Sequence, residues 1–209
     1  MIERLAAQFN AGGNFMWIIL FVLGFAVAVM IERLFYLYIY CYGSNMNFVK
    51  KVIAAIKGQK VEDAKKMVAD RSSPMHRLLY TAVDQYASGA TQTQVMEKVE
   101  QSAIRELPRL QKRINYLSLV ANVATLLGLL GTIMGLQLSF SSLADVDTAQ
   151  RASMLAMGIS QAMNTTAFGL IVAVPCMVMF TFLSNKQQAL VKNIDEGISH
   201  LLSALKESE

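Results

Sequence analysis

The sequence has few charges for its length, and three long stretches have none. Charged residues make up 16% of the 209 residues and hydrophobic residues 54%, whereas about a quarter of a typical soluble domain is charged. The charge-free stretches cover residues 5–31, 114–144 and 152–185. Because about 20 apolar residues cross a bilayer as a helix, they predict three membrane-spanning helices. This pattern excludes a disordered chain, a secreted disulfide scaffold and an ordinary cytosolic enzyme.

Cysteine and histidine are scarce, with two of each. Cys41 follows the first apolar stretch and Cys176 lies inside the third, so we expect two buried free thiols and no disulfide. His76 and His200 stand alone in polar surroundings and are expected on the solvated surface. No acid, base or histidine lies inside an apolar stretch, and no HExxH, GxSxG or Cys/His cluster is present. We therefore expect no enzyme, no metal site and no cofactor.

The polar region between the first two apolar stretches has the pattern of amphipathic helices. Its apolar residues recur at spacings of three and four, and turn signals are few. The fold class is therefore predicted to be all-α, with three transmembrane helices extended into a helical polar region. The periodic residues are Val61, Ala64, Met67, Val68, Val95, Val99 and Ile104, and the turn signals are Gly58, Ser72 to Pro74, and Ser88 to Gly89.

The distribution of charge predicts the orientation in the membrane. Between Glu32 and Arg113 there are 14 Lys/Arg and 8 Asp/Glu, a balance of +6, whereas the segment from Asp145 to Arg151 has two acids and one base. Positive charge near membrane ends marks the cytoplasmic side, so the amino terminus is predicted outside and the carboxyl terminus inside. This distribution explains the net charge of +4 without a nucleic-acid partner. The expected segments are an N-terminal segment outside (1–14), a first transmembrane helix with its extension (15–42), a cytoplasmic helical region (43–113), a second transmembrane helix (114–144), a short connector outside (145–156), a third transmembrane helix (157–185) and a cytoplasmic C-terminal helix (186–209).

Uncharged polar residues gather on faces of the second and third spans. At about 100° per residue, Ser118, Asn122, Thr125, Thr132 and Ser139 fall within one arc of the second span, beside Gly128, Gly131 and Gly135. In the third span Gln161, Asn164 and Thr165 share a face, and Thr166 points elsewhere. Such residues either hold helices together or line a wet path, and both interpretations remain open here. Pro175 lacks one backbone hydrogen bond and is expected to bend the third helix.

Two motifs resemble a known family. The run Gly128-Leu129-Leu130-Gly131-Thr132-Ile133-Met134-Gly135, followed by Phe140, resembles the second-span signature of the MotA/TolQ/ExbB proton-channel family. The run Gly158-Ile159-Ser160-Gln161-Ala162-Met163, with Thr166, Gly169-Leu170 and Val174-Pro175, resembles its third-span signature. The flanks Gly12-Gly13, Met16 and Glu32-Arg33 resemble those of its first span. Three spans fit the ExbB/TolQ branch rather than the four-span stator branch.

The resemblance implies a subunit of an ion-driven motor in the bacterial inner membrane, with a periplasmic amino terminus. It implies a homopentamer around a single-span partner like ExbD or TolR, whose transmembrane aspartate carries the proton, and a TonB-like energy transducer as a further partner. The proton motive force would then drive mechanical work at the cell envelope. By position, Thr132 and Thr166 match the two threonines of the family's ion path. The other expected path residues are Gln161, Asn164, Thr165 and Thr125, and the helix-packing residues are Gly128, Gly131, Gly135, Gly169 and Pro175.

The sequence departs from the family pattern at two positions. Gln161 stands where ExbB and TolQ have a glutamate, and Thr125 where they have a proline. An amide cannot titrate, so a proton-relay role of that glutamate does not transfer, and the added neutral oxygens would also suit sodium. A non-conducting oligomeric scaffold and a sodium-coupled motor therefore remain alternatives. The output of the motor, whether import, envelope maintenance or motility, is left open.

Overall fold

The computed structural model describes residues 9, 12–13, 15–41, 46–58, 60–69, 73–143 and 147–207. Most of the expected N-terminal segment 1–14 and part of the expected connector, including residue 145, lie outside these ranges. The chain divides into two compact units. The first unit consists of Met1–Ile31 and Arg113–Thr181, and the second of Glu32–Lys112 and Phe182–Glu209.

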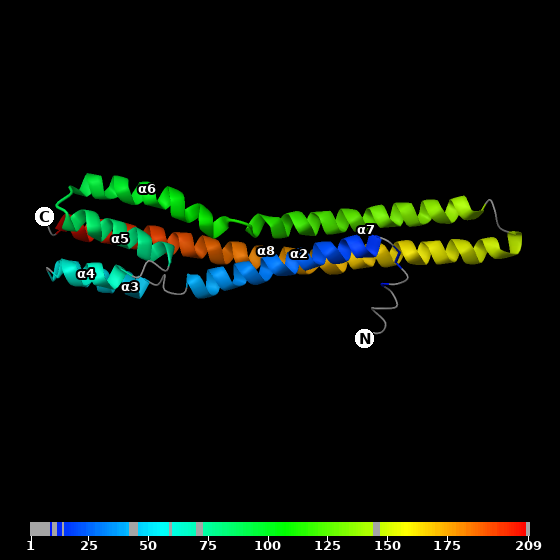
Figure 1. Cartoon of the computed structure of the whole chain (residues 1–209), viewed down its shortest axis with the longest axis horizontal. Helices are drawn as coiled ribbons and strands as arrows, with labels where there is room; N and C mark the ends of the chain where they lie inside the picture. Colours follow the sequence, from blue (N-terminus) through cyan, green and yellow to red (C-terminus); the bar gives the residue numbers. More distant parts are fainter. Residues whose placement is uncertain are drawn as a thin grey trace. The chain divides into compact units, whose positions relative to one another are not determined.

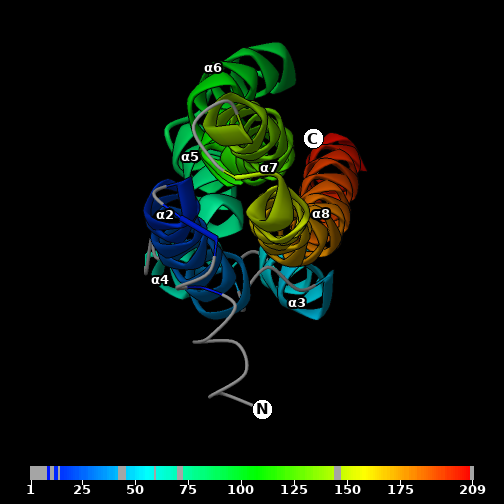
Figure 2. The same cartoon turned by 90° about the vertical axis from the view of Figure 1, so that its right-hand side faces the viewer.

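Three apolar helices form the first unit. α2 (Phe15–Phe35) up to residue 31, α7 (Ile114–Ser142) and the first half of α8 (Thr148–Glu207) run side by side (Figures 1 and 2). They share a core of small and β-branched side chains, which lets the helix backbones approach closely. The core residues are Ile19 and Ala26 on α2, Val120, Ala121 and Ala124 on α7, and Val172, Ala173 and Cys176 on α8.

The prediction of three spanning helices in an all-α fold is confirmed. Three helical stretches, residues 15–39, 92–142 and 148–206, are long and apolar enough to cross a membrane, and the described residues contain no strand. Helix α8 begins at Thr148, inside the segment expected to be a connector, and continues without interruption through Pro175 to Glu207. Both cysteines are buried and free, as predicted.

Four shorter helices and the end of α8 make up the second unit. They are α3 (Met46–Lys57), α4 (Val61–Val68), α5 (Pro74–Ala87) and α6 (Gln92–Gln111), and a π-helical segment, η1 (Tyr36–Tyr40), follows α2. The predicted turn signals bound them. Ser73 caps α5 and Pro74 occupies its first turn, where a missing N–H costs nothing. Gly89, with φ of +79°, follows the end of α5 in the left-handed conformation that glycine accepts readily.

Helix α5 is the core of the second unit and packs against both α4 and α6. Half of its residues are buried, including Met75, Leu78 and Leu79. The end of α8 also contacts this core, because a Cβ added at Gly197 would lie 3.0 Å from Val49 and 3.2 Å from Met75. Of the periodic apolar residues, Ala64, Val68, Val95 and Val99 are buried as predicted, whereas Met67 and Ile104 are 39% and 73% exposed.

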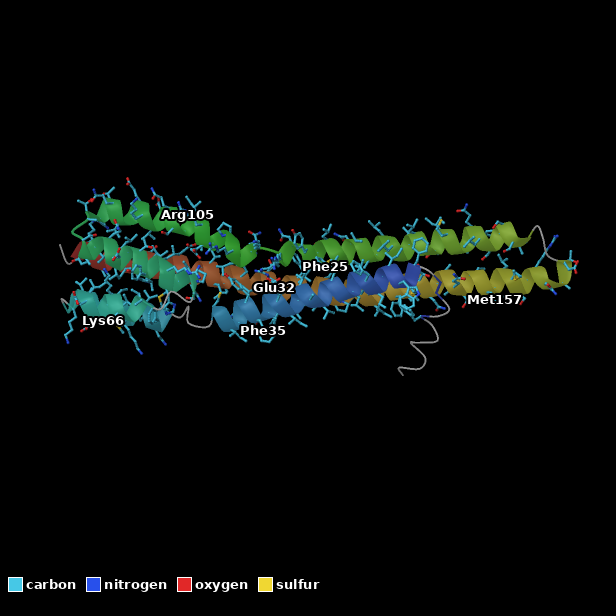
Figure 3. All side chains as sticks on the ribbon, viewed as in Figure 1. Phe25, Glu32, Phe35, Lys66, Arg105 and Met157 are labelled. Atoms are coloured by element: carbon cyan, nitrogen blue, oxygen red, sulfur yellow. The ribbon has the colours of Figure 1, made fainter. Side chains whose placement is uncertain are left out.

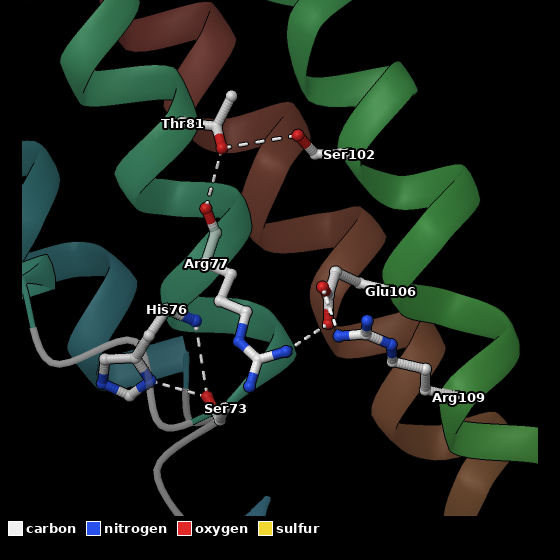
Figure 4. A network of polar contacts seen from close by, with 7 residues as sticks. All are labelled: Ser73, His76, Arg77, Thr81, Ser102, Glu106 and Arg109. Carbon is white, nitrogen blue, oxygen red and sulfur yellow. Dashed lines mark hydrogen bonds and ion pairs between the residues drawn. The ribbon is translucent and has the colours of Figure 1, made fainter.

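Polar contacts join the helices around α5 (Figure 4). Glu106 of α6 accepts from Arg77 of α5 and from Arg109 of its own helix, both at 2.8 Å. The prediction that His76 is a solvated surface residue is wrong. It is 9% exposed, its Nδ1 lies 2.6 Å from Ser73 Oγ, and the Phe48 ring lies 4.4 Å from its own. The physical reason is its place in the first turn of α5, on the buried face.

Candidate functional site

Two threonine hydroxyls meet between α7 and α8 in the first unit. Thr132 Oγ1 of α7 and Thr166 Oγ1 of α8 form a short hydrogen bond in which either can donate. Thr166 also reaches across to the carbonyl of Gly128 at 3.0 Å. Thr132 lies 3.1 Å from that same carbonyl and 3.4 Å from the carbonyl of Ala162 on the other helix. Two hydroxyls and two carbonyls therefore form one polar cluster inside an apolar unit.

Glycines make this close approach of the helices feasible. A Cβ added at Gly128 would lie 3.2 Å from the backbone Cα of Thr166. A Cβ added at Gly169 would lie 2.6 Å from the carbonyl oxygen of Ala124 and 3.0 Å from the Cα of Gly128. These neighbours are backbone atoms, which cannot rotate away. Any side chain at either glycine would therefore push α7 and α8 apart at the threonine pair.

The other two glycines of α7 face side chains of α8. A Cβ at Gly131 would overlap the Thr165 side chain, and one at Gly135 would lie 3.1 Å from the Cβ of Ala162. Gly128, Gly131, Gly135 and Gly169, the residues expected in helix packing, thus all lie where α7 and α8 meet. Pro175, the fifth residue of that group, is exposed within α8.

Thr165 and Gln161 contact the chain that precedes α2 rather than the threonine pair. Thr165 is 1% exposed, and its hydroxyl donates to the carbonyl of Gly12 or Gln161, both at 3.0 Å. The amide of Gln161 lies against Gly13, which has a φ of +75° and where a Cβ would lie 3.4 Å from Gln161 Cδ. Sequence reasoning did not find this role of the residues before α2. The glycine pair itself was the available signal, since each glycine allows close approach.

The remaining expected path residues lie apart from the pair. Thr125 is exposed on α7, two turns before Thr132, and its hydroxyl donates to its own helix at Ala121, 3.0 Å away. Asn164 is half-buried and, with Ser160 and neighbouring apolar residues, lines an open groove of about 420 Å³ on α8. The structure thus brings Thr132 and Thr166 together, sets Thr165 and Gln161 against residues 12 and 13, and leaves Thr125 and Asn164 at the surface.

The polar cluster can exchange hydrogen bonds but cannot hold a charge by itself. No charged residue occurs within α7 or between residues 151 and 186 of α8. Among the described residues no group of His, Cys, Asp or Glu could hold a metal ion. Each hydroxyl can donate one hydrogen bond and accept others, so either threonine can be the donor in the pair. The site can therefore solvate an ion or pass a proton, provided that another chain supplies the titrating group.

Comparison with known proteins identifies the family. The model of the MotA/TolQ/ExbB proton channel family matches residues 70–196, more than half of the chain. The chain belongs to this family. Its matched part includes all of α5, α6 and α7 and the first part of α8, so both threonines and all four packing glycines fall inside it.

Individual relatives place it in the ExbB/TolQ-like branch. It is 33% identical to the biopolymer transport protein ExbB-like 3 of Synechocystis sp. over 171 residues, 80% of each chain. It is 32% identical to the Tol-Pal system protein TolQ of Haemophilus influenzae over 48% of this chain and 44% of TolQ. It is 35% identical to the biopolymer transport protein ExbB of Aquifex aeolicus over 37% of this chain and 51% of ExbB. The TolQ and ExbB matches thus span about half of those proteins.

Membership of the family, together with the three apolar helices, assigns the location and the general function of the chain. The chain is a multi-pass protein of the inner membrane and a subunit of a proton-channel, energy-transducing family. This family comprises channel and motor subunits and is not a class of enzymes.

Proposed function

We propose that the chain is the ExbB/TolQ-like subunit of an inner-membrane motor that converts the proton motive force into mechanical work. The observation that carries the proposal is the hydroxyl pair of Thr132 and Thr166, which lies in two charge-free stretches, residues 114–144 and 152–185. A proton channel needs a titratable group such as a carboxylate at membrane depth, and the charge-free stretches of this chain contain no Asp, Glu, Lys, Arg or His. The carboxylate must therefore come from a partner, for which an ExbD/TolR-like single-span chain with a transmembrane aspartate is the proposed source.

Several copies of the chain would surround that partner, and a pentamer is the proposed number. Lipid-facing and partner-facing surface is abundant on the first unit, where Phe21, Leu126 and Leu138 are all more than 60% exposed. Thr132 and Thr166 would face the partner's carboxylate, with Gln161, Asn164 and Thr125 along the same path. Thr165, together with the glycines, would hold α7 and α8 in register. Transmission of the motion to a TonB-like transducer is proposed as the output.

The threonine pair has a defined chemical task in this proposal. A hydroxyl can donate to an ionised carboxylate or hold a water that passes the proton on. Because Thr166 now donates to a backbone carbonyl or to Thr132, an arriving carboxylate would exchange one hydrogen bond for another. Hydrogen bonds to charged groups contribute about 1.5–3 kcal/mol, which corresponds to roughly a tenfold to a hundredfold change in a rate that depends on them.

Removing each hydroxyl tests this function. Thr132→Val and Thr166→Val, purified with a co-expressed ExbD-like partner and reconstituted in proteoliposomes, should assemble normally and lose about tenfold or more of the proton flux. Thr181→Val is the matched control, because the Thr181 hydroxyl is exposed and bonds only to its own helix at Met177, 3.0 Å away. Gln161→Ala should cost less, since an amide releases no proton at neutral pH.

The same flux assay addresses the two alternative functions. Thr132 lies within hydrogen-bonding distance of Thr166 and of the carbonyls of Gly128 and Ala162, and Thr166 of the Gly128 carbonyl; four such oxygens would also suit a sodium ion. Flux that follows a sodium gradient and not a proton gradient would favour a sodium-coupled motor. Wild-type flux and function in both threonine variants would refute the proposed path, and absence of flux with the partner present would favour a non-conducting scaffold.

The proposed orientation places the amino terminus in the periplasm and residues 43–113 in the cytoplasm. Cysteines introduced by Asp147→Cys and Ala90→Cys report the two sides, and the buried native thiols give little background. A membrane-impermeant maleimide added to intact spheroplasts should label position 147 and leave position 90 unlabelled until the cells are lysed. The opposite labelling pattern would show that the orientation is reversed, and the inference drawn from the charge balance of +6 would be wrong.

A further inference from the structure

An apolar groove lies in the second unit where α2 ends beside α8. It is lined by Leu34, Phe35, Tyr38, Ile39 and Phe182 and has a volume of about 350 Å³. The rings of Tyr38 and Phe182 are stacked, with centroids 6.1 Å apart and an interplanar angle of 9°. Phe35 is the last residue of α2 (Figure 3), and the π-helical segment η1 begins at the next residue. Segments of π-helix are rare and often mark functional positions.

The groove residues are unusually exposed for their size. Phe35 is 58%, Ile39 62% and Phe182 51% exposed. Four of the five lining residues lie within the apolar stretch 15–39 that is long enough to cross a membrane. In a membrane-spanning helix these side chains would lie among the acyl chains at the end of the first span, on the side of residues 43–113, out of reach of a water-soluble occupant.

A lysine lies beside this groove. Lys186 lies one helical turn after Phe182, on the same face of α8, and its Nζ is 4.9 Å from the centroid of the Tyr38 ring. It is half-buried, and no carboxylate among the described residues pairs with it. Glu32, the acid nearest in sequence to the groove, forms an ion pair with Arg33, with 2.9 Å between Oε1 and Nη2.

The thiol beside this lysine does not neutralise it. Burial raises the pKa of Cys41 to about 11, and the positive charge of Lys186 lowers it only in part. Cys41 is therefore uncharged at neutral pH. The groove thus combines an apolar channel with one uncompensated positive charge, and its occupant must bring both an apolar chain and a negative charge.

We propose that this groove is a binding site for an anionic phospholipid, with an acyl chain along the five apolar residues and the phosphate at Lys186. Basic residues at the cytoplasmic ends of membrane helices attract anionic headgroups. A helix from a second copy of the chain would fill the groove less well, because the runs 5–31, 114–144 and 152–185 hold no charge that could pair with Lys186, and Glu32 already pairs with Arg33. The inference requires only that residues 15–39 cross the membrane, so it can hold or fail independently of ion conduction.

Site-specific fluorescence quenching by brominated lipids tests the proposal. Trp17 is the only tryptophan of the chain, so a Trp17→Phe background is dark, and Phe182→Trp places a reporter in the groove. Phe35→Trp is a second reporter, in case the first disturbs the Tyr38 stack. Phe21→Trp, at a position 80% exposed on the first span, reports ordinary contact with lipid. Each full-length variant is reconstituted in phosphatidylcholine nanodiscs that contain brominated phosphatidylglycerol or brominated phosphatidylcholine.

The groove reporters should be half-quenched at about a fivefold lower mole fraction of brominated phosphatidylglycerol than of brominated phosphatidylcholine, since one basic residue near the surface contributes about that factor. The Phe21→Trp control should not distinguish the two lipids. Lys186→Gln should abolish the preference, whereas Lys192→Gln, which removes an equal charge on the same helix, should keep it. Equal quenching by both lipids would overturn the proposal. Protection from both lipids would also overturn it, because a protein segment would then cover the groove.

Discussion

The contact between α7 and α8 can be tested with a single methyl group. Gly169→Ala would place a Cβ 2.6 Å from the carbonyl oxygen of Ala124 and 3.0 Å from the Cα of Gly128. Ordinary contacts begin at 3.4 Å, so the two backbones would have to separate by about 0.8 Å. Overpacking of this kind costs about 1–3 kcal/mol, and the backbone neighbours favour the upper part of that range.

Gly24→Ala is the matched control. It lies in α2 of the same unit, and a Cβ there would have nothing within 4 Å. Replacing glycine by alanine in a helix also gains up to about 1 kcal/mol of helix propensity. Both variants receive that gain, so the difference between them isolates the cost of overpacking.

Unfolding by SDS titrated into mild-detergent micelles, followed by circular dichroism, measures this difference. Gly169→Ala should unfold at a lower SDS fraction than wild type, and Gly24→Ala at the same or a higher fraction. The separation of α7 and α8 should also break the bond between Thr132 and Thr166, so Gly169→Ala should lose ion flux even where it remains folded. If the two alanine variants unfold together, the close approach of these helices contributes nothing to stability and the packing role of Gly169 is refuted.

Two further predictions concern the second unit. Since burial raises the pKa of Cys41 from 9.0 to about 11, its alkylation by iodoacetamide in a Cys176→Ala background should rise with a midpoint near pH 11. The folded state should lose stability as the pH rises from 9 towards 11, because the thiol of the unfolded chain ionises first. An alkylation midpoint near pH 9 would show that Cys41 is not buried. Arg33 is 4% exposed and donates to Glu32 at 2.9 Å and to the carbonyl of Arg109 at 3.4 Å. Arg33→Leu should therefore lower the free energy of unfolding by about 2 kcal/mol, and Arg109→Leu, whose side chain is 54% exposed, by less than 1 kcal/mol.

The spanning helices were predictable because membrane burial depends on composition alone. Three charge-free runs determine three apolar helices, whatever packs against them. The start of α8 at Thr148 was not predictable in this way. The change from polar to apolar residues near 157 marks the limit of the apolar stretch, and a helix can continue into water without a break. Helix ends depend on caps and turns, which the sequence between 145 and 156 does not specify.

The direction of each polar side chain was only partly predictable. A helical wheel gives relative angles, so Thr165 and Thr166 were expected on different faces, and they do have different partners. The wheel does not say which face meets α7. That choice follows from where glycines allow contact, and Gly128 opposite Gly169 brings Thr166 rather than Thr165 to Thr132. The prediction for His76 failed for a similar reason, since the Phe48 ring that packs on it belongs to another helix, α3, whose position the sequence of α5 does not reveal.

Packing and ion conduction need not be competing roles for the threonine pair. In the chain by itself, Thr132 and Thr166 bond to each other and to the carbonyls of Gly128 and Ala162, which is how polar side chains hold membrane helices together. The Gly128 carbonyl lies within hydrogen-bonding distance of both hydroxyls, so it keeps a donor when one of them turns away. In the proposed motor, a carboxylate that approaches the pair would therefore take one donor without leaving a buried acceptor unpaired. Such an exchange costs little, and it would allow the carboxylate to bind and leave repeatedly while the glycine contacts hold α7 and α8 in place.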